Sequence, residues 1–418
     1  MNACIITIGD EILIGQTLDT NSQWISDQLT TKGINVKEMI SISDEKEHIL
    51  KTLSRCSSEN DIVLITGGLG PTNDDITKLT LSEFTGSELQ FRPEIFDGLK
   101  KYFEKRNKDL IEKNRSQAYL PVNAIAIPNH RGTASGMWIE HDQTVLVSMP
   151  GVPTEMKNMM LVILQMIEEK FDLPCIVFKH VLTASIAEAI LSDQLQEFEE
   201  QLPKHVKLAY LPNLGQVKLR LTAKGDDSAS LSKDIDREVQ KLKSIIGKHI
   251  FGYNDDTLAG KLGLLLLNEQ KSLATAESCT GGYIAHQITS IAGSSSYFKG
   301  SLIAYSNEIK TSILKVKEET IVRYGAVSIE TVEEMLKGIL ELTGADYGIA
   351  VSGIAGPTGG SEEKPVGTIC IGVGSRDKIY VKQHQLLKDR MLNIKLTSTI
   401  ALDSMRKFLK RQLELHPK

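Results

Sequence analysis

The sequence predicts an α/β protein with three domains, and three observations support this fold class. The chain has 418 residues, more than one hydrophobic core usually serves. Near both ends, apolar runs of strand length alternate with helical patterns, as in α/β domains. Between Phe171 and Phe251 the pattern changes to strand, helix, strand, strand, helix. We therefore expect a doubly wound domain at 1–170, a small α+β domain at 171–252 and an α/β domain at 256–414.

The composition restricts the class of protein. Hydrophobic residues make up 41% and charged residues 24% of the chain, as in ordinary globular proteins. A formal net charge of −5 gives no general attraction to nucleic acid or to anionic membranes. Five scattered cysteines without a C-x-x-C spacing indicate a reducing cytosol and argue against a disulfide framework or zinc cluster. Without a signal peptide or membrane-length apolar run, we expect a cytoplasmic protein with no membrane partner and no direct nucleic-acid partner.

The first domain starts with a strand that is apolar throughout, Ala3 to Ile8, which indicates a sheet covered on both faces. Asp19-Thr-Asn-Ser22 supplies N-cap candidates for a helix that Gly33 ends. A strand at 34–42, a helix at 45–53 and a strand at 61–66 follow. This β-α-β-α-β order implies a parallel sheet with right-handed crossovers.

Ligands of such sheets bind at the carboxyl ends of strands. Gly9-Asp10-Glu11 follows the first strand, and the glycine-rich stretch from Gly67 to Asp75 follows the third. Its backbone can cradle a phosphate while Asp74 or Asp75 binds a hard cation such as Mg²⁺. It is neither a Walker loop nor a dinucleotide fingerprint, and a glycine turn with an aspartate N-cap is the alternative. Carboxylates at two neighbouring strand ends, Asp10 and Glu11 among them, favour the metal.

Further along, a charged helical stretch at 92–115 precedes a strand at 145–149. That strand ends in Pro150-Gly151, followed by a helix at 159–167, so this loop either closes over the same ligand or is a rigid connector. The middle domain lacks a GxxG clamp and stacking aromatic residues, which favours a structural or dimerising role.

The central stretch of the last domain is Thr275-Ala-Glu-Ser-Cys-Thr-Gly-Gly282, between a short apolar run and a helical pattern. A strand, loop and helix start of this kind presents unpaired backbone N–H groups and the positive end of a helix dipole. It offers a carboxylate, two hydroxyls and a thiol for an anion site with a nucleophile. The alternative is a helix N-cap supplied by Thr280 or Ser278.

The elements that follow bring further polar residues to strand ends. A strand at 301–305 delivers Tyr305 and Lys310, Ser328 caps a helix to about Leu342, and a strand at 346–352 ends in the glycine-rich loop 353–360. A strand at 379–384 and a terminal helix complete the domain. Two loops at strand ends predict a second small-molecule pocket. Its nucleophile is Ser278 or Cys279, and the available bases are Tyr305 and a desolvated Lys310.

These motifs together resemble one family. The chain is similar to the CinA family, competence/damage-inducible protein A, over essentially its full length. The resemblance rests on these stretches: Ile6 to Leu13, Asp19 to Ser22, Thr66 to Thr72 with Asp74-Asp75, Pro150 to Met156, Thr275 to Gly282, Gly325 to Ser328, Ser352 to Pro357 and Glu363 to Thr368.

The resemblance implies a fold and two activities. The first domain looks like the molybdopterin-binding fold, which in this family hydrolyses ADP-ribose to AMP and ribose 5-phosphate with a divalent metal (Mg, Mn or Co) and potassium as a further activator. The middle domain is similar to a KH-type domain. The last looks like nicotinamide-mononucleotide deamidase, which needs no cofactor and releases ammonia. It implies a homodimeric bifunctional hydrolase of NAD metabolism and pyridine nucleotide salvage.

Carried over residue by residue, the resemblance assigns roles. Ser278 is the nucleophile, the Tyr305–Lys310 pair takes its proton, the following backbone N–H groups stabilise the oxyanion, and Arg390 with loop 353–360 holds the ribose phosphate. The remaining C-terminal binding residues are Glu277, Cys279, Thr280, Gly281, Gly282, Gly353, Gly356, Gly359 and Gly360. The N-terminal binding residues are Gly9, Asn21, Gly67, Gly68, Gly70, Thr72, Pro150 and Gly151. The metal ligands are Asp10, Glu11, Asp74 and Asp75.

Two positions depart from the family pattern. Thr183-Ala-Ser-Ile-Ala-Glu188 replaces a Gly-Ile-Gly-Glu type of turn, and Ile394, not Lys395, stands where a second basic residue often follows Asp389-Arg390. Two alternatives to the bifunctional hydrolase remain. The first domain binds a pterin or nucleotide ligand without hydrolysing it, or the chain is a non-enzymatic partner in DNA uptake or repair.

Overall fold

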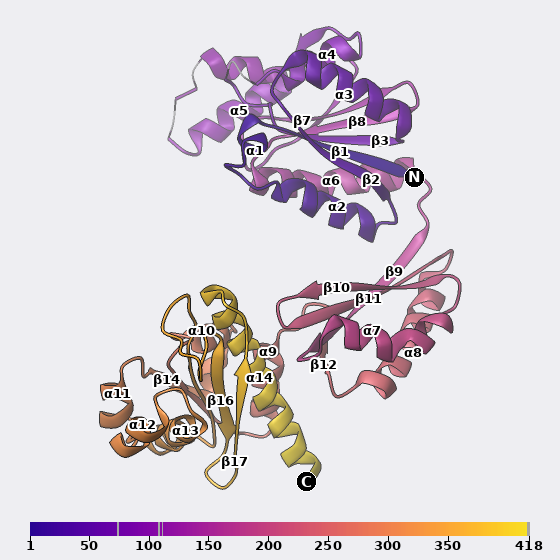
Figure 1. Ribbon diagram of the computed structural model, residues 1–418. Coiled ribbons are helices and arrows are strands. Elements are labelled where there is room, and N and C mark those ends of the chain that lie inside the picture. Colours follow the sequence, from indigo (N-terminus) through magenta and orange to yellow (C-terminus); the bar gives the residue numbers. More distant parts are fainter. Residues whose placement is uncertain (73–74, 108, 111, 416–418) are drawn as a thin grey trace. The chain divides into compact units, whose positions relative to one another are not determined.

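The computed structural model describes residues 1–72, 75–107, 109–110 and 112–415 (Figure 1). The chain divides into two units, one of Met1–Val177 with Lys224–Leu231 and one of Phe178–Ala223 with Ser232–Lys418. Asp74, predicted as a metal ligand, lies outside the described residues.

Within the described residues of the first unit, the main sheet has six strands in the order β2-β1-β3-β8-β7-β6. β2, β1, β3 and β8 are parallel, as predicted, whereas β7 and β6 pair antiparallel at one edge. The elements of this domain are β1 (Asn2–Ile8), α1 (Asp10–Leu13), α2 (Thr20–Thr31), β2 (Asn35–Ile42), α3 (Lys46–Glu59), β3 (Ile62–Thr66), α4 (Thr77–Phe84), β4 (Leu89–Phe91), α5 (Pro93–Glu104), a 3₁₀ helix (Glu112–Ala118), β5 (Tyr119–Pro121), β6 (Ala124–Ile127), β7 (Gly136–His141), β8 (Thr144–Met149) and α6 (Pro153–Lys170).

Helices cover both faces of this sheet, which is why β1 is apolar from Ala3 to Ile6. Ala3 and Ile5 belong to a core that includes residues of α2 and α6. Cys4 and Ile6 point to the other face, into a core shared with α3 and α4. Successive residues of one strand therefore serve two cores, as the period-two geometry of a strand requires (Figure 1).

The middle domain is a four-stranded sheet in the order β10-β11-β9-β12 with two helices, as far as the structure describes it. Its elements are β9 (Cys175–Ala184), α7 (Glu188–Glu200), β10 (Val206–Asn213), β11 (Gln216–Gly225), α8 (Ser228–Ile246) and β12 (Ile250–Tyr253). The predicted strand-helix-strand-strand-helix order is thus present, with one additional strand, β12, at its end.

The last domain contains a five-stranded sheet, counted over its described residues, in the order β14-β13-β15-β16-β17. β14, β13 and β15 are parallel, and β16 and β17 continue antiparallel. The elements are α9 (Leu258–Asn268), β13 (Leu273–Glu277), α10 (Tyr283–Thr289), a 3₁₀ helix (Ser294–Ser296), β14 (Phe298–Ile303), α11 (Asn307–Ser312), α12 (Glu318–Tyr324), α13 (Ile329–Thr343), β15 (Tyr347–Gly353), β16 (Thr368–Gly374), β17 (Ile379–Gln385) and α14 (Arg390–Leu415).

A buried polar cluster joins the middle domain to α14. The Asp403 carboxylate accepts hydrogen bonds from the Arg406 guanidinium at 2.7 and 2.9 Å and from the Ser185 hydroxyl at 2.7 Å. Arg406 also donates to the carbonyl oxygen of Ile250 in β12 at 3.4 Å. Asp403 is 0% and Arg406 1% exposed, so this ion pair is removed from water and satisfied by neighbouring polar groups.

Several local predictions can be compared with the structure. Ser328 caps α13 as predicted, because its hydroxyl accepts from the N–H of Thr331 at 3.1 Å. The predicted charged helix at 92–115 is instead α5 followed by a separate 3₁₀ helix.

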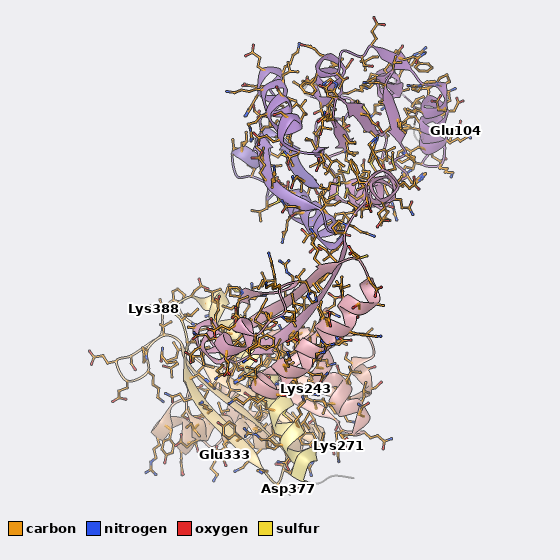
Figure 2. The ribbon with its side chains drawn as sticks, turned by 90° about the vertical axis from the view of Figure 1, so that its right-hand side faces the viewer. Glu104, Lys243, Lys271, Glu333, Asp377 and Lys388 are labelled. Carbon is orange, nitrogen blue, oxygen red and sulfur yellow. The ribbon has the colours of Figure 1, made fainter. Side chains whose placement is uncertain are left out.

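Charged residues such as Lys243, Lys271 and Asp377 lie on the outside of the fold (Figure 2). In the described part of the chain, no helix combines the length and apolar character needed to cross a membrane.

Candidate functional site

The predicted N-terminal site lies at the carboxyl ends of β1, β3 and β8. Gly67 and Gly68 have positive φ angles of 111° and 63°, and a Cβ on Gly67 would meet the Ile8 carbonyl oxygen at 2.2 Å. The amide of buried Asn21 donates to the Gly151 carbonyl at 2.7 Å and to the Thr66 hydroxyl at 3.3 Å. The structure therefore brings the predicted residues of these loops together, and backbone approach explains the glycines.

Asp75 has a different environment from the one predicted for a free metal ligand. Its carboxylate accepts from the N–H of Gly70 at 2.7 Å, from the N–H of Thr72 at 2.8 Å and from the Thr72 hydroxyl. These bonds fold the glycine-rich loop and occupy both carboxylate oxygens. Asp10 and Glu11 are exposed in α1. Among the described residues, these carboxylates form no group of three with ligand atoms within 4.8 Å of one another.

A cavity of about 690 Å³ opens beside this loop. Its lining includes Gly70, Thr72, Asp75, Lys78 and Arg115. Burial lowers the pKa of Lys78 to about 8, although the neighbouring Asp75 carboxylate opposes this shift. Sequence reasoning missed both cations. The position of Lys78 in the sequence could have indicated a role in the site, because it lies in the first turn of the helix that follows the acidic loop.

In the C-terminal domain, the Glu277 side chain is enclosed by protein. Glu277 is the last residue of β13 and is 0% exposed. Its carboxylate accepts from the backbone N–H groups of Gly282, Ile284 and Ala285 at 2.8 to 3.1 Å. The hydroxyls of Thr275, Thr280 and Ser301 donate to it as well. The predicted roles of Glu277 and Thr280 in substrate binding are therefore not supported, because these groups bind one another.

This arrangement also corrects the predicted N-cap. α10 begins after Gly282, which has a left-handed conformation, and no side chain of a flanking hydroxyl residue caps it. Glu277 instead supplies the negative charge that neutralises the helix N-terminus from the end of the neighbouring strand. The N-terminal N–H groups of α10 are consequently occupied.

Ser278 follows directly and lies against a buried lysine. The Nζ atom of Lys310 is 3.1 Å from the Ser278 hydroxyl oxygen, and Lys310 is 1% exposed. Nζ also donates to the carbonyl oxygens of Ala304 at 2.8 Å and Tyr305 at 3.3 Å. Among the described residues, none of these hydrogen-bond partners of Lys310 is a carboxylate. Burial lowers the pKa of Lys310, so its neutral form is more accessible than that of an ordinary lysine.

The rival nucleophile Cys279 is buried and faces the protein interior. Burial raises the pKa of its thiol to about 12, so the thiol is protonated at neutral pH. A Cβ placed on Gly353 would lie 3.2 Å from the Cys279 sulfur, which locates the thiol against that strand end. The Cys279 side chain is therefore buried against the end of β15, with 6% of the residue exposed.

The hydroxyl group of Tyr305, predicted to act with Lys310 on the nucleophile, is hydrogen-bonded to Arg390. The side chain of Tyr305 is 61% exposed, and its hydroxyl accepts from the Arg390 guanidinium at 3.0 Å. Arg390 donates to the Gly356 carbonyl at 2.9 Å as well. The structure thus joins Arg390, Tyr305 and the loop 353–360, whereas the Ser278 hydroxyl is hydrogen-bonded to Lys310.

Two residues to which sequence reasoning gave no role hold this glycine-rich loop and the segment that follows it. Lys364 donates to the carbonyl oxygens of Tyr324 at 2.6 Å and Val327 at 2.8 Å. Asn393, 0% exposed in the first turn of α14, donates to the Ala355 carbonyl at 2.9 Å. Gly356 and Gly359 have positive φ angles of 91° and 93°, so glycine suits both positions. The polar amide between the apolar residues Leu392 and Ile394 was the available sequence signal for Asn393.

Three family models match successive parts of the chain. A model described as a probable molybdopterin binding domain matches residues 4–169, the damage-inducible protein CinA KH domain matches 179–252, and the CinA C-terminal domain matches 255–409. A CinA-like protein of Cytophaga hutchinsonii is 44% identical over 409 residues, covering 98% of each chain. The chain belongs to the CinA family.

The chain is also similar to a second relative and to a solved structure. The CinA-like protein of Flavobacterium psychrophilum is 41% identical and covers 94% of this chain and 96% of its own. The crystal structure of the competence/damage-inducible protein CihA from Agrobacterium tumefaciens is 36% identical over 37% of this chain and 93% of its own, with a TM-score of 0.36. The CinA chain described here thus has a molybdopterin-binding-like domain, a KH-like domain and a CinA C-terminal α/β domain, as the sequence predicted.

The Glu277 carboxylate yields a prediction for this CinA domain. We expect Glu277→Gln to lower the free energy of unfolding by about 2 kcal/mol, because the amide cannot accept all the buried N–H groups. Thermal denaturation measures this as a lower midpoint, and Glu362→Gln, in an exposed loop, serves as the matched control. Equal midpoints for the two variants would contradict the role given to Glu277.

Proposed function

We propose that the C-terminal domain is an amidohydrolase that converts nicotinamide mononucleotide to nicotinate mononucleotide and ammonia through Ser278. The contact between Ser278 and the buried Lys310, at 3.1 Å, carries the proposal. Family membership and the match of the C-terminal domain support it. The substrate itself comes from the family resemblance of the motifs.

The hydrogen bonds of Lys310 support a role as the general base. A neutral amine has two N–H donors and one lone pair. The Ala304 and Tyr305 carbonyls provide two acceptors, which leaves the lone pair of a neutral Nζ for the Ser278 proton. Because burial lowers the pKa of Lys310 and the neighbouring Cys279 thiol is uncharged at neutral pH, little in this environment favours the protonated form.

The reaction then follows from these groups. Lys310 accepts the hydroxyl proton as the Ser278 oxygen attacks the carboxamide carbon, and the resulting ammonium returns a proton to the departing ammonia. The backbone N–H groups of Cys279 and Thr280, which directly follow the nucleophile, are the donors for the oxyanion. Water then hydrolyses the acyl-enzyme. In this step Lys310 accepts a proton from the water and returns a proton to the Ser278 oxygen.

Arg390 is the cation proposed to bind the phosphate of the substrate. Its guanidinium is held by the Gly356 carbonyl and the Tyr305 hydroxyl. A guanidinium fixed in this way offers its remaining N–H groups to a phosphate with little loss of conformational freedom. Tyr305 therefore positions Arg390 in this proposal, instead of taking a proton from Ser278.

The assignment of the nucleophile is tested by ammonia release from nicotinamide mononucleotide. We expect Ser278→Ala and Lys310→Met each to lower kcat/KM by on the order of 10³-fold, because each removes one half of the nucleophile and base pair. Cys279→Ala, which removes a buried protonated thiol, is the matched control and should retain activity. Activity in Ser278→Ala together with its loss in Cys279→Ala would assign the reaction to the thiol.

The pH dependence tests the base. The pKa of Lys310 is lowered from 10.5, and its deprotonated form is the active one, so kcat/KM should rise with pH along a limb whose midpoint lies below that value. The residual activity of Lys310→Met should lack this limb. A limb that persists unchanged in the variant would show that another group titrates.

A second activity is proposed for the N-terminal domain: hydrolysis of ADP-ribose to AMP and ribose 5-phosphate with a divalent metal. The observation that favours an anionic substrate is the pair of cations, Lys78 and Arg115, in the cavity beside the glycine-rich loop. The described carboxylates do not converge as a three-ligand set, so no reaction step is assigned to a metal here.

This activity is tested by AMP release from ADP-ribose with Mg²⁺, Mn²⁺ or Co²⁺. We expect Lys78→Ala to lower the activity roughly tenfold or more through the loss of one charge-assisted contact to a phosphate. Asp75→Ala should lower it through loss of the loop bonds, and Ser278→Ala, altered in the other domain, is the control. Binding of ADP-ribose without AMP release under any metal would favour the non-hydrolytic alternative.

A further inference from the structure

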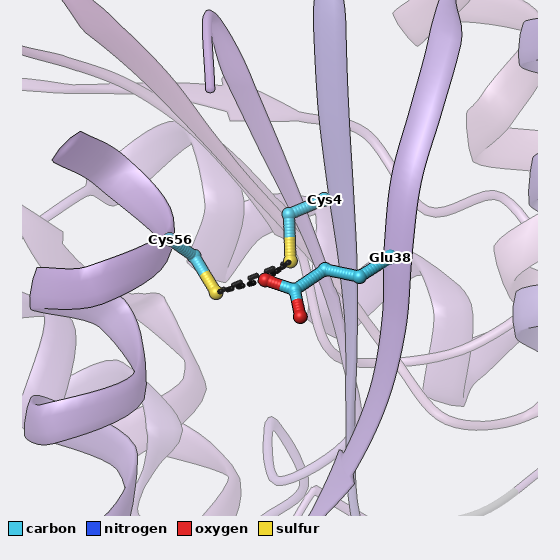
Figure 3. A group of neighbouring side chains, drawn as sticks. All are labelled: Cys4, Glu38 and Cys56. Atoms are coloured by element: carbon cyan, nitrogen blue, oxygen red, sulfur yellow. Dashed lines mark hydrogen bonds between the residues drawn. The ribbon is translucent and has the colours of Figure 1, made fainter. Parts of the chain in front are cut away.

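Two cysteines that are distant in the sequence meet in the core of the N-terminal domain. Cys4 lies in β1 and Cys56 in α3, and their sulfur atoms are 3.2 Å apart (Figure 3). Both side chains are 0% exposed. The hydrogen bonds of the described residues include no second pair of cysteine sulfurs. The scattered positions of the cysteines in the sequence did not reveal this contact.

A surface ion pair lies next to the two sulfurs. The Glu38 carboxylate in β2 is 4.0 Å from the Cys4 sulfur and 3.8 Å from the Cys56 sulfur (Figure 3). The same carboxylate oxygen pairs with the Arg55 guanidinium at 2.6 Å. Because the side chains of Glu38 and Arg55 are 32% and 47% exposed, the thiol pair lies directly under a partly solvated ion pair.

The two thiols have unequal acidities. The hydrogen bond that Cys4 donates lowers the pKa of Cys56, and the positive charge of Arg55 acts in the same direction. The same bond and burial raise the pKa of Cys4. A thiolate at Cys56 facing a protonated thiol at Cys4 is the state from which a dithiol is oxidised.

The geometry distinguishes a dithiol from a metal site. Two sulfurs bound tetrahedrally to zinc at 2.3 Å are about 3.8 Å apart, which exceeds the 3.2 Å observed here. The Glu38 oxygen that faces the sulfurs is already paired with the Arg55 guanidinium at 2.6 Å. The positive charge of Arg55 would repel a metal cation bound to that oxygen. A disulfide, in contrast, requires the two sulfurs to approach from 3.2 Å to about 2.05 Å.

We propose that Cys4 and Cys56 form a site of reversible oxidation, at which a peroxide converts the dithiol to an intramolecular disulfide. The Cys56 thiolate attacks one oxygen of hydrogen peroxide, which yields a sulfenic acid and, after protonation, water. Cys4 then loses its proton and attacks that sulfur, a second water leaves, and the two sulfurs have given two electrons to the peroxide. A small-molecule thiol reverses the step by thiol–disulfide exchange.

Glu38 opposes ionisation of Cys56. Its negative charge raises the pKa of Cys56, and its carboxylate lies 3.8 Å from the Cys56 sulfur. Glu38→Gln removes this charge and keeps the size of the side chain. The variant should therefore increase the thiolate fraction of Cys56, and the rate of oxidation reports on this contact.

The full-length protein is treated with hydrogen peroxide, free thiols are alkylated, and the digested peptides are analysed by mass spectrometry. We expect one crosslinked peptide pair, Cys4 with Cys56, that returns to two free thiols after reduction. Cys175→Ser, at a half-buried cysteine of β9, is the matched control and should leave the crosslink intact. Two alkylatable thiols at Cys4 and Cys56 after treatment, or a sulfinic acid at Cys56 without a crosslink, would overturn the proposal.

A second variant and a metal competition complete the test. Glu38→Gln should form the disulfide roughly threefold faster or more, since oxidation follows the thiolate fraction. An equal or slower rate would contradict the position given to Glu38. Co²⁺ added to the reduced protein should give no thiolate-to-cobalt absorption. An absorption band that disappears in Cys56→Ala would assign the pair to a metal instead of a disulfide.

Discussion

The C-terminal site depends on one buried carboxylate. Glu277 ends β13 and binds three backbone N–H groups at the start of α10, so the strand and the helix are held at a fixed separation across the turn that carries Ser278. This use of the helix N-terminus has a chemical consequence. The positive end of the dipole is neutralised from inside the protein, so it is not available to an anionic ligand, and the proposed function assigns the binding of the substrate phosphate to Arg390 instead.

Lys310 and Lys78 have different environments. Lys310 is 1% exposed and has carbonyl and hydroxyl partners, an environment that suits the neutral base proposed above. Lys78 is half-buried and lines a cavity with Asp75, whose charge opposes the lowering of its pKa by burial. In the proposed functions, Lys310 therefore transfers a proton, whereas Lys78, with a pKa of about 8, is largely protonated at neutral pH and binds an anion.

Sequence patterns predicted the elements better than the partners of polar side chains. The apolar run of β1 correctly indicated a sheet buried on both faces, and Ser328 was correctly expected to cap a helix. The sequence also indicated that Ser278 and Lys310 share one edge of a sheet. It did not reveal that Glu277 and Asp75 turn inward to bind backbone N–H groups. An acidic residue beside glycines can stabilise a loop through backbone hydrogen bonds or bind a ligand, and the sequence pattern is the same in both cases. The contact between Cys4 and Cys56 depends on the packing of α3 on β1, which has no local sequence signal.

The cluster of Ser185, Asp403 and Arg406 bears on how the chain can be divided. The family model of the C-terminal domain begins at residue 255, after both Ser185 and Ile250. A chain shortened to that boundary would lose the hydroxyl that binds Asp403 and the carbonyl that binds Arg406, and it would expose apolar residues such as Leu258 that share a core with Phe251. The middle domain therefore covers part of the surface of the C-terminal domain and supplies partners to its buried ion pair, so insertion or deletion near Ser185 or Ile250 is expected to destabilise the C-terminal domain as well.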